Sequence, residues 1–448
     1  MATADVAIIG AGLAGLATAV RLAEHGARVV VLAQGNGAIH WAGGPIDVAV
    51  APGVDTPAAA VGRLASNPAH PYAVLADDVP HALGWFGSLV AEGDLPHAGS
   101  PGDPFRALPT GIGGTRPVAI VPNGQAAILR PWDPGERLVV VGPAGFKDFW
   151  PLAIAASLRR PSVWGGLDRP ERVEGVSVEL PGLAARRNLN ALRIADLFDD
   201  PAWRRPALEA IARAVDVTGS GPLRVGLPAV VGCRDHGAAL RGALEVVDWP
   251  IVELPLVPPG IPGIRLYGLL RDALRARGGR LLLGEPVVRV ETDGRRVLSV
   301  ATSAAARSYV IRVGSLVLAT GGIAGGGLVG DPDGRIVETV LGLPAEGPPI
   351  DRWMTGDPLD PGSMPIALAG VRTDGELRPV DPADPGAGPV FDNVRVVGGL
   401  LAGQRSLAER CGDGIALASA WRAAASIATG GGGAVGTAAA VPAPGGSR

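Results

Sequence analysis

The chain has 448 residues, 47% of them hydrophobic but only 4% aromatic, so it is long enough for two or three domains with cores rich in Ala, Val and Leu. Its formal net charge of −3 and the lack of a long basic run argue against nucleic acid as a partner. Only two cysteines are present, Cys233 and Cys411, which excludes a zinc site or an iron–sulfur cluster built on cysteines and fits a reducing cytoplasm.

The first 35 residues predict a dinucleotide-binding unit of strand, glycine-rich turn, helix and second strand. We expect the strands at residues 5–9 and 28–32 and the helix at 16–24. The turn has the spacing G-x-G-x-x-G, in which the first glycine permits the tight turn, the second admits a phosphate, and the third lets helix and strand pack closely. The helix N-terminus adds positive charge beneath a pyrophosphate. The expected cofactor-binding residues here are Gly10, Gly12, Leu13, Ala14 and Gly15.

One element of this motif is missing, because no carboxylate follows the second strand. An acid that binds the nucleotide ribose is expected there, about 20 residues after the turn. Residues 31–35 instead read Val-Leu-Ala-Gln-Gly. Gln34 or Asn36 could bond the ribose, or the adenosine half could be loosely held or absent. We include Ala33 and Gln34 in the expected cofactor site, and the missing acid leaves the identity of the cofactor open.

The middle of the chain predicts a mixture of loops, helices and a few strands. Expected helices are 56–64, 79–91, 149–158, 188–198 and 206–215, and expected strands are 137–141 and 176–180. Asn188 is the expected N-cap of the fourth helix. A proline-rich connector at 254–262 ends this region.

The α/β pattern then returns. Expected helices are 264–277 and 412–428, and expected strands are 280–283, 287–291, 297–302, 308–313, 316–319 and 394–397. Residues 430–448, rich in Gly, Ala and Pro, are expected to form a disordered tail. We expect no signal peptide before the first strand and no membrane helix, because no stretch reaches the roughly 18 apolar residues that such a helix needs.

Two further glycine turns follow strands of this second α/β part. Small residues at the carboxyl end of a parallel strand suit the close approach of a cofactor. A helix that begins beside Asp413 could stabilise negative charge on a reduced flavin ring. Either turn could also be a plain connection without a ligand. The expected cofactor-binding residues of this part are Ala319, Thr320, Gly321, Gly322, Gly398, Gly399, Asp413 and Gly414.

Together these patterns predict an α/β fold with a Rossmann-like, doubly wound sheet that binds FAD or NAD(P). The flavin-binding domain would combine residues 1–50 with 256–429, residues 51–255 would form an inserted cap or interface region, and 430–448 the tail.

Three motifs in this order resemble the flavin-binding domain shared by fumarate reductase and succinate dehydrogenase flavoproteins. Within that superfamily, residues 4–428 are most similar to the B subunits of anaerobic glycerol-3-phosphate dehydrogenases. The stretches that carry this resemblance are 38–47, 142–149, 256–266 and 319–328.

The resemblance implies a flavin-binding subunit that works with a catalytic A subunit and an iron–sulfur subunit that anchors the complex to the membrane. The complex would oxidise sn-glycerol 3-phosphate to dihydroxyacetone phosphate and pass electrons to the quinone pool, and the chain would be cytoplasmic, peripheral to the inner face of the membrane. The family is assigned FMN, whereas the dinucleotide turn suits FAD. Two alternatives remain: a self-sufficient flavin dehydrogenase or oxidase of another small substrate, and a flavin-free structural subunit.

Single residues outside these motifs carry weaker expectations, and no catalytic residue or metal ligand is assigned. His40 is expected near the flavin, with covalent attachment as an alternative. An arginine could hold a phosphate, although most arginines are solvated; the candidates are Arg116, Arg265 and Arg405. The pair Lys147 and Asp148 could lie near the flavin or an interface, or form a local ion pair. The histidines expected to be surface or structural residues are His25, His70, His81, His97 and His236.

Overall fold

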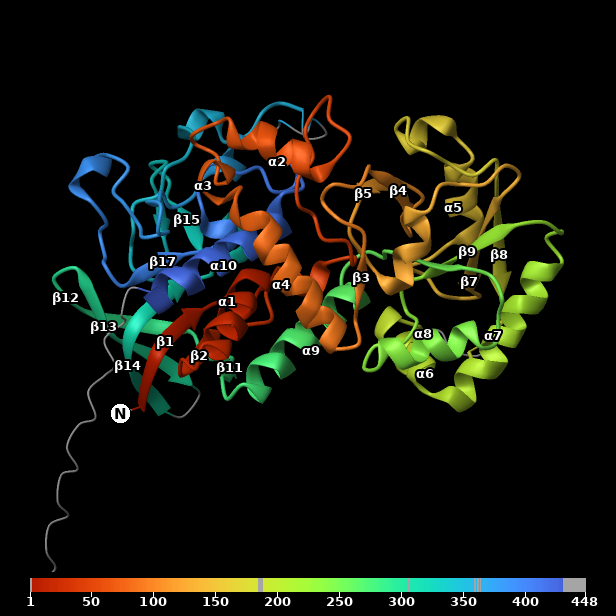
Figure 1. The fold of residues 1–448 in the computed structure, drawn as a ribbon, viewed down its shortest axis with the longest axis horizontal. Helices are drawn as coiled ribbons and strands as arrows, with labels where there is room; N and C mark the ends of the chain where they lie inside the picture. The colour runs from red at the N-terminus through yellow and green to blue at the C-terminus, as the bar shows by residue number, and fades with distance from the viewer. Residues whose placement is uncertain are drawn as a thin grey trace, which may run out of the picture.

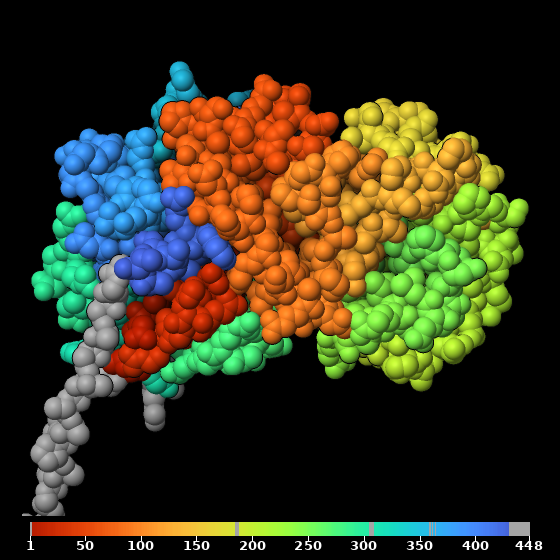
Figure 2. Space-filling view, viewed as in Figure 1, coloured from red at the N-terminus to blue at the C-terminus, as the bar shows by residue number. Residues whose placement is uncertain are grey.

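A computed structural model describes residues 2–183, 188–304, 307–357, 360, 362 and 364–429, so the expected tail lies outside the described residues. Within these ranges the chain forms two lobes, each with its own sheet and hydrophobic core (Figure 1). The two ends of the described chain meet in the first lobe, drawn in red and blue, and the yellow and green middle forms the second. The space-filling view shows the two lobes in contact through the orange segment (Figure 2).

The first lobe is built on a seven-stranded sheet with the order β11-β2-β1-β14-β13-β12, in which β17 also pairs with β14. Strands β11, β2, β1, β14 and β17 are parallel, and β13 and β12 continue the sheet in antiparallel fashion. Apolar side chains fill the central strands, so both faces are covered. The strands are β1 (Ala2–Ile9), β2 (Val29–Ala33), β11 (Arg280–Leu283), β12 (Val287–Asp293), β13 (Arg296–Ala304), β14 (Arg307–Leu318) and β17 (Val394–Val396).

Helix α1 (Leu13–Glu24) packs between α9 (Ile261–Ala276) and α10 (Gly412–Thr429). Both α4 (Asp78–Glu92) and α3 (Tyr72–Leu75) contact α10, and α2 (Pro57–Ala65) contacts α3. These three helices come from the expected inserted region, yet their apolar side chains belong to the first core. The division of the chain at residues 50 and 255 therefore stays a prediction.

The second lobe contains a four-stranded parallel sheet of order β10-β9-β7-β8, which the sequence did not predict as a unit. Its strands are β7 (Arg137–Pro143), β8 (Arg172–Val178), β9 (Leu223–Pro228) and β10 (Ile251–Leu254). Its helices are α5 (Pro151–Leu158), α6 (Ala191–Asp199), α7 (Pro201–Asp216) and α8 (His236–Leu244). Three short antiparallel pairs complete the described fold: β3 (His97–Ala98) with β6 (Val121–Pro122), β4 (Arg106–Pro109) with β5 (Thr115–Val118), and β15 (Leu328–Gly330) with β16 (Ile336–Glu338).

The doubly wound α/β fold is thus confirmed, and some element boundaries were wrong. The N-cap of α6 is Asn190 rather than Asn188, and its side chain accepts the N–H of Arg193 at 2.8 Å. Helix α7 begins at Pro201, five residues before the interior Pro206, because Asp200 caps it and Pro201 occupies the first turn. The strands expected at 308–313 and 316–319 are one strand, β14, which pairs with β13 in its first half and β17 in its second.

Candidate functional site

A cavity of ≈ 760 Å³ lies where the parallel strands of the first sheet end. Its wall takes residues from the turns that follow β1, β2, β11, β14 and β17. The carboxyl end of a doubly wound parallel sheet is where such folds bind ligands, and the volume falls within the range of cofactor sites. The cavity is therefore the candidate ligand site.

The backbone of the glycine turn after β1 packs directly against the backbone of the turn after β14. Gly10 has φ +114°, and a Cβ on it would lie 2.2 Å from the carbonyl oxygen of Ala319. A Cβ on Gly15 would lie 2.0 Å from the carbonyl oxygen of Gly10. Side chains at these two positions would therefore push α1 and β14 away from β1.

Gly12 differs from these two glycines because the space beside it is open. A Cβ built on Gly12 would meet no atom of the described chain within 4 Å, and Gly12 lies in the cavity wall. It is also the N-cap of α1 and has no side chain with which to cap the helix. The N–H groups of the first turn are thus available to an anionic group, which the helix dipole would stabilise.

The N-terminus of α10 forms another part of the wall and is hydrogen-bonded to the backbone of Asp47. The Oδ2 atom of Asp413 accepts the N–H of Asp47 at 2.9 Å, and the N–H of Gly414 donates to the carbonyl of Asp47 at 3.0 Å. Burial, together with the neighbouring Asp47 carboxylate, raises the pKa of Asp413 to about 7. Asp47 in turn pairs with Arg116 at 2.5 Å. Near neutral pH this corner of the cavity can therefore hold or release a proton on Asp413.

Two polar atoms in residues of the cavity wall are buried without a hydrogen-bond partner in the described part of the chain. They are Oγ1 of Thr320 and Oε1 of Gln404. Buried polar groups are almost always hydrogen-bonded, so these two atoms are suited to polar groups of a ligand. The open space at Gly12 and these two atoms fit a dinucleotide with a polar ring system.

Most of the predicted cofactor residues come together in this wall. Those that line the cavity are Gly10, Gly12, Leu13, Ala14, Ala33, Gln34, Ala319, Thr320, Gly321, Gly399 and Asp413. The predicted residues that fall outside the lining are Gly15, His40, Gly322, Gly398 and Gly414. Gly15 and Gly398 instead permit close packing, since a Cβ on Gly398 would lie 2.6 Å from Cβ of Ala14.

His40 packs against the edge of α9 rather than lining the cavity. Its ring meets that of Tyr267 in a T-shaped contact with centroids 4.6 Å apart, and burial lowers its pKa. Its carbonyl accepts the N–H of Gly260 at 2.8 Å. The structure thus gives His40 a role in holding α9, and covalent attachment of a flavin gains no support from this position.

The candidate arginines near the cavity are engaged by acids and carbonyls. Arg265 lies in the wall, but its guanidinium forms two bonds to Glu253, at 2.7 and 2.8 Å, and others to the carbonyls of Val231 and Gly232. Arg116 is held by Asp47. Arg405 lies outside the lining and donates its backbone N–H to Glu409. Lys147 and Asp148 are exposed in the turn before α5, away from the cavity wall.

Several wall residues were not predicted. His97, expected to be a surface or structural residue, lies in the wall, and burial lowers its pKa to about 4. Glu285 follows β11 and was not considered. The sequence does carry a signal for it, because residues 281–285 form an apolar run, a glycine and an acid. The unpredicted polar residues of the wall are His97, Glu285, Thr339, Gln404 and Ser406.

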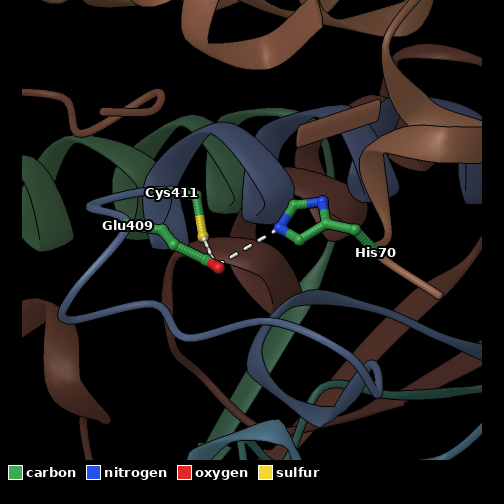
Figure 3. Close-up of side chains that lie close together, drawn as sticks. All are labelled: His70, Glu409 and Cys411. Carbon is green, nitrogen blue, oxygen red and sulfur yellow. Dashed lines mark hydrogen bonds and ion pairs between the residues drawn. The ribbon is translucent and has the colours of Figure 1, made fainter. Parts of the chain in front are cut away.

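His70, Glu409 and Cys411 form a compact cluster beside the start of α10 (Figure 3). The Nε2 atom of His70 lies 3.3 Å from Oε2 of Glu409, and the Cys411 thiol donates to the same oxygen at 3.6 Å. The Nδ1 atom of His70 accepts the N–H of Tyr72 at 3.1 Å, so the neutral ring carries its proton on Nε2, facing Glu409. Burial raises the pKa of the Cys411 thiol, and the cluster is best described as hydrogen-bonded support for the loop before α10.

The fold and this cavity define a dinucleotide-binding flavoprotein, and comparison with known proteins agrees. A family model described as "FAD binding domain" matches residues 5–415. The anaerobic glycerol-3-phosphate dehydrogenase B subunit of Yersinia pestis is 30% identical over 93% of this chain and 96% of its own length. The probable B subunit of the corresponding enzyme in Halobacterium salinarum is 32% identical over 95% and 97%.

The chain therefore belongs to the family of anaerobic glycerol-3-phosphate dehydrogenase B subunits, FAD-dependent oxidoreductases with the FAD-binding domain. Among solved structures, 3-ketosteroid Δ1-dehydrogenase from Sterolibacterium denitrificans matches with 11% identity over 96% of this chain and 100% of its own, at a TM-score of 0.42. Escherichia coli quinol fumarate reductase matches with 12% identity over 97% and 72%, also at 0.42. Within the described residues, no helix combines the length and apolar character that crossing a bilayer requires.

Proposed function

We propose that this chain is the FAD-carrying B subunit of an anaerobic-type sn-glycerol-3-phosphate dehydrogenase. In this proposal a catalytic A subunit takes two electrons and two protons from glycerol 3-phosphate, which becomes dihydroxyacetone phosphate. An iron–sulfur subunit accepts the electrons, passes them towards a quinone pool and holds the complex at the inner face of the cell membrane. The observation that carries the proposal is the glycine-walled cavity with its open position at Gly12, in a chain of the B-subunit family.

The residues of the wall suit FAD in distinct ways. Backbone N–H groups at Gly12 and in the first turn of α1 would bind the diphosphate. Thr320 and Gln404 supply polar atoms without partners in the described chain, and Asp413 at the start of α10 can carry a proton near pH 7. When bound, the flavin supplies the redox chemistry, while these residues position it and set its electrostatic surroundings.

The arginines near the cavity favour a subunit that relays electrons over a self-sufficient enzyme, and the cysteine count is compatible with that role. Arg265, in the cavity wall, uses all three of its guanidinium nitrogens for Glu253 and two backbone carbonyls, so it is not poised for a substrate phosphate. Arg116 pairs with Asp47, which neutralises its charge, although its Nε has no partner in the described chain. The two cysteines of the sequence cannot hold an iron–sulfur cluster, so single electrons would leave through another subunit.

The test compares the purified full-length chain alone with the chain co-expressed with an A subunit. We expect stoichiometric FAD to be released from the chain by acid, and glycerol 3-phosphate to reduce a dye only when the A subunit is present. Dye reduction by the chain alone would instead favour the self-sufficient enzyme. Partner binding by a chain that takes up no flavin would favour the structural subunit.

A further inference from the structure

The adenosine end of the cavity lies between the ends of two neighbouring parallel strands. After β2 the wall contains Ala33, Gln34 and Gly35, where the usual ribose-binding acid is missing. Strand β11 pairs with β2 on its outer side, with Leu283 opposite Ala33. The chain that leaves β11 therefore enters the cavity beside the position of the missing acid.

Glu285 is the acid that this second strand brings to the wall. Its backbone N–H lies 3.3 Å from the carbonyl oxygen of Ala33, and Gly284 donates to the same oxygen at 2.9 Å. These bonds fix the backbone of Glu285 directly next to the end of β2. The residue lines the cavity.

The carboxylate of Glu285 is held by a hydroxyl from the neighbouring hairpin. Thr302 of β13 is fully buried, and its Oγ1 donates to Oε2 of Glu285 at 3.1 Å. An ionised carboxylate has about four acceptor positions, of which Thr302 uses one. The remaining positions suit the two hydroxyls of a ribose, which donate hydrogen bonds to an acid in dinucleotide-binding folds.

We propose that Glu285 is the carboxylate that binds the adenosine ribose hydroxyls of FAD in this chain, in place of an acid after β2. Thr302 is its positioning residue. The proposal rests on FAD binding by this cavity and adds a source of selectivity: FMN has no adenosine ribose, so Glu285 favours FAD over FMN. Gln34, which follows the neighbouring strand β2, adds only an uncharged second contact to the ribose.

The test measures FAD and FMN affinity of the flavin-depleted full chain by fluorescence titration. The variant Glu285→Gln keeps the size of the side chain but removes its charge. We expect FAD to bind about 10- to 100-fold more weakly, because a charge-assisted hydrogen bond is lost, while FMN affinity stays unchanged. Thr302→Val should weaken FAD several-fold and leave FMN unaffected.

A matched control is Glu291→Gln. Glu291 lies in the adjacent strand β12 and also accepts a hydroxyl, from Ser299 at 2.8 Å, but it is not part of the cavity wall. This control should bind both flavins like the wild type. Unchanged FAD affinity in Glu285→Gln, or equal losses for FAD and FMN, would overturn the proposal while FAD binding by the wild type stands. A wild-type chain that binds no FAD would overturn the cofactor assignment and this inference together.

Discussion

Gly12 and Gly10 lie two residues apart, yet the structure assigns them different tasks that substitution can separate. A methyl group at Gly12 would enter open space in the cavity wall, whereas one at Gly10 would collide with the backbone of Ala319. Gly12→Ala should therefore leave the fold intact and weaken cofactor binding. Gly10→Ala should damage the fold itself.

The magnitudes follow from these contacts. Replacing an N-cap glycine by alanine costs about 1 kcal/mol or less of unfolding free energy. The same methyl group would hold a phosphate away from the N–H groups of the turn, and losing one or two charge-assisted bonds costs about 2–4 kcal/mol, or about 30- to 1000-fold in Kd. For Gly10→Ala, left-handed strain and a 2.2 Å approach to the Ala319 carbonyl together should cost at least about 2 kcal/mol of stability.

The assay combines urea unfolding of each variant with FAD titration. Gly268→Ala is the control, because Gly268 lies within α9, outside the cavity wall, and its Cβ would also meet no described atom within 4 Å. It should bind FAD like the wild type and gain slightly in stability. If Gly12→Ala kept wild-type FAD affinity, the diphosphate could not lie against this turn and the reasoning would fail.

Three further predictions concern buried titratable groups. The pKa of Asp413 rises from 3.8 to about 7 on folding, so the native state binds more protons and loses up to about 4 kcal/mol of stability as the pH rises from 4 to 7. Asp413→Asn should remove that loss, which urea unfolding of flavin-depleted protein at pH 5 and pH 8 would reveal; an equal wild-type-to-variant difference at both pH values would contradict it. Glu253→Gln leaves the buried Arg265 without its charge partner and should lower the free energy of unfolding by about 3–5 kcal/mol. The control Glu209→Gln, in an exposed ion pair, should change it little, and equal unfolding midpoints for the two variants would contradict the prediction. A thiol reagent at pH 8 should react with the half-buried Cys233 far faster than with Cys411, which is buried and whose thiol pKa is raised by that burial. The variant C233S should leave one slow thiol, and rapid labelling of C233S would contradict the buried position of Cys411.

The first lobe could be predicted from the sequence because its signals are local. The unit at residues 5–32 contains strand, turn and helix in one contiguous stretch. At Gly10 and Gly15 the neighbouring backbone lies so close that only glycine fits. Helix α10 likewise begins at Gly412, where the pattern placed it. Local patterns of this kind need no knowledge of tertiary contacts.

The second sheet could not be predicted as a unit because the sequence of its strands does not show that they are buried. Strand β10 contains Glu253, which suggests an exposed position, yet Glu253 is fully buried against Arg265. Although burial alone would raise it, the pKa of Glu253 lies below its ordinary value because of Arg265. A buried ion pair formed by residues 12 positions apart leaves no trace in hydrophobic periodicity.

Helix α9 explains why residues of both lobes meet at the cavity. It begins at Ile261 in the second core and continues through Leu266, Leu270 and Leu274 in the first. Its first turn is bound to the loop around His40, since Gly260 and Gly263 donate to the carbonyls of His40 and Ala42 at 2.8 and 3.1 Å.

Both that loop and the first turn of α9 contribute to the wall, through Ile39, Ala42, Pro262 and Gly263. A cofactor in the cavity would therefore contact the first turn of α9, where the two lobes meet, as well as the turn after β1 that would bind its phosphates. Any ligand that binds only the native arrangement stabilises it by mass action. FAD should accordingly stabilise the contact between α9 and the loop around His40 together with the first lobe. Because Arg265 of α9 lies in the cavity wall and pairs with the buried Glu253 of β10, it connects cofactor binding with the second sheet.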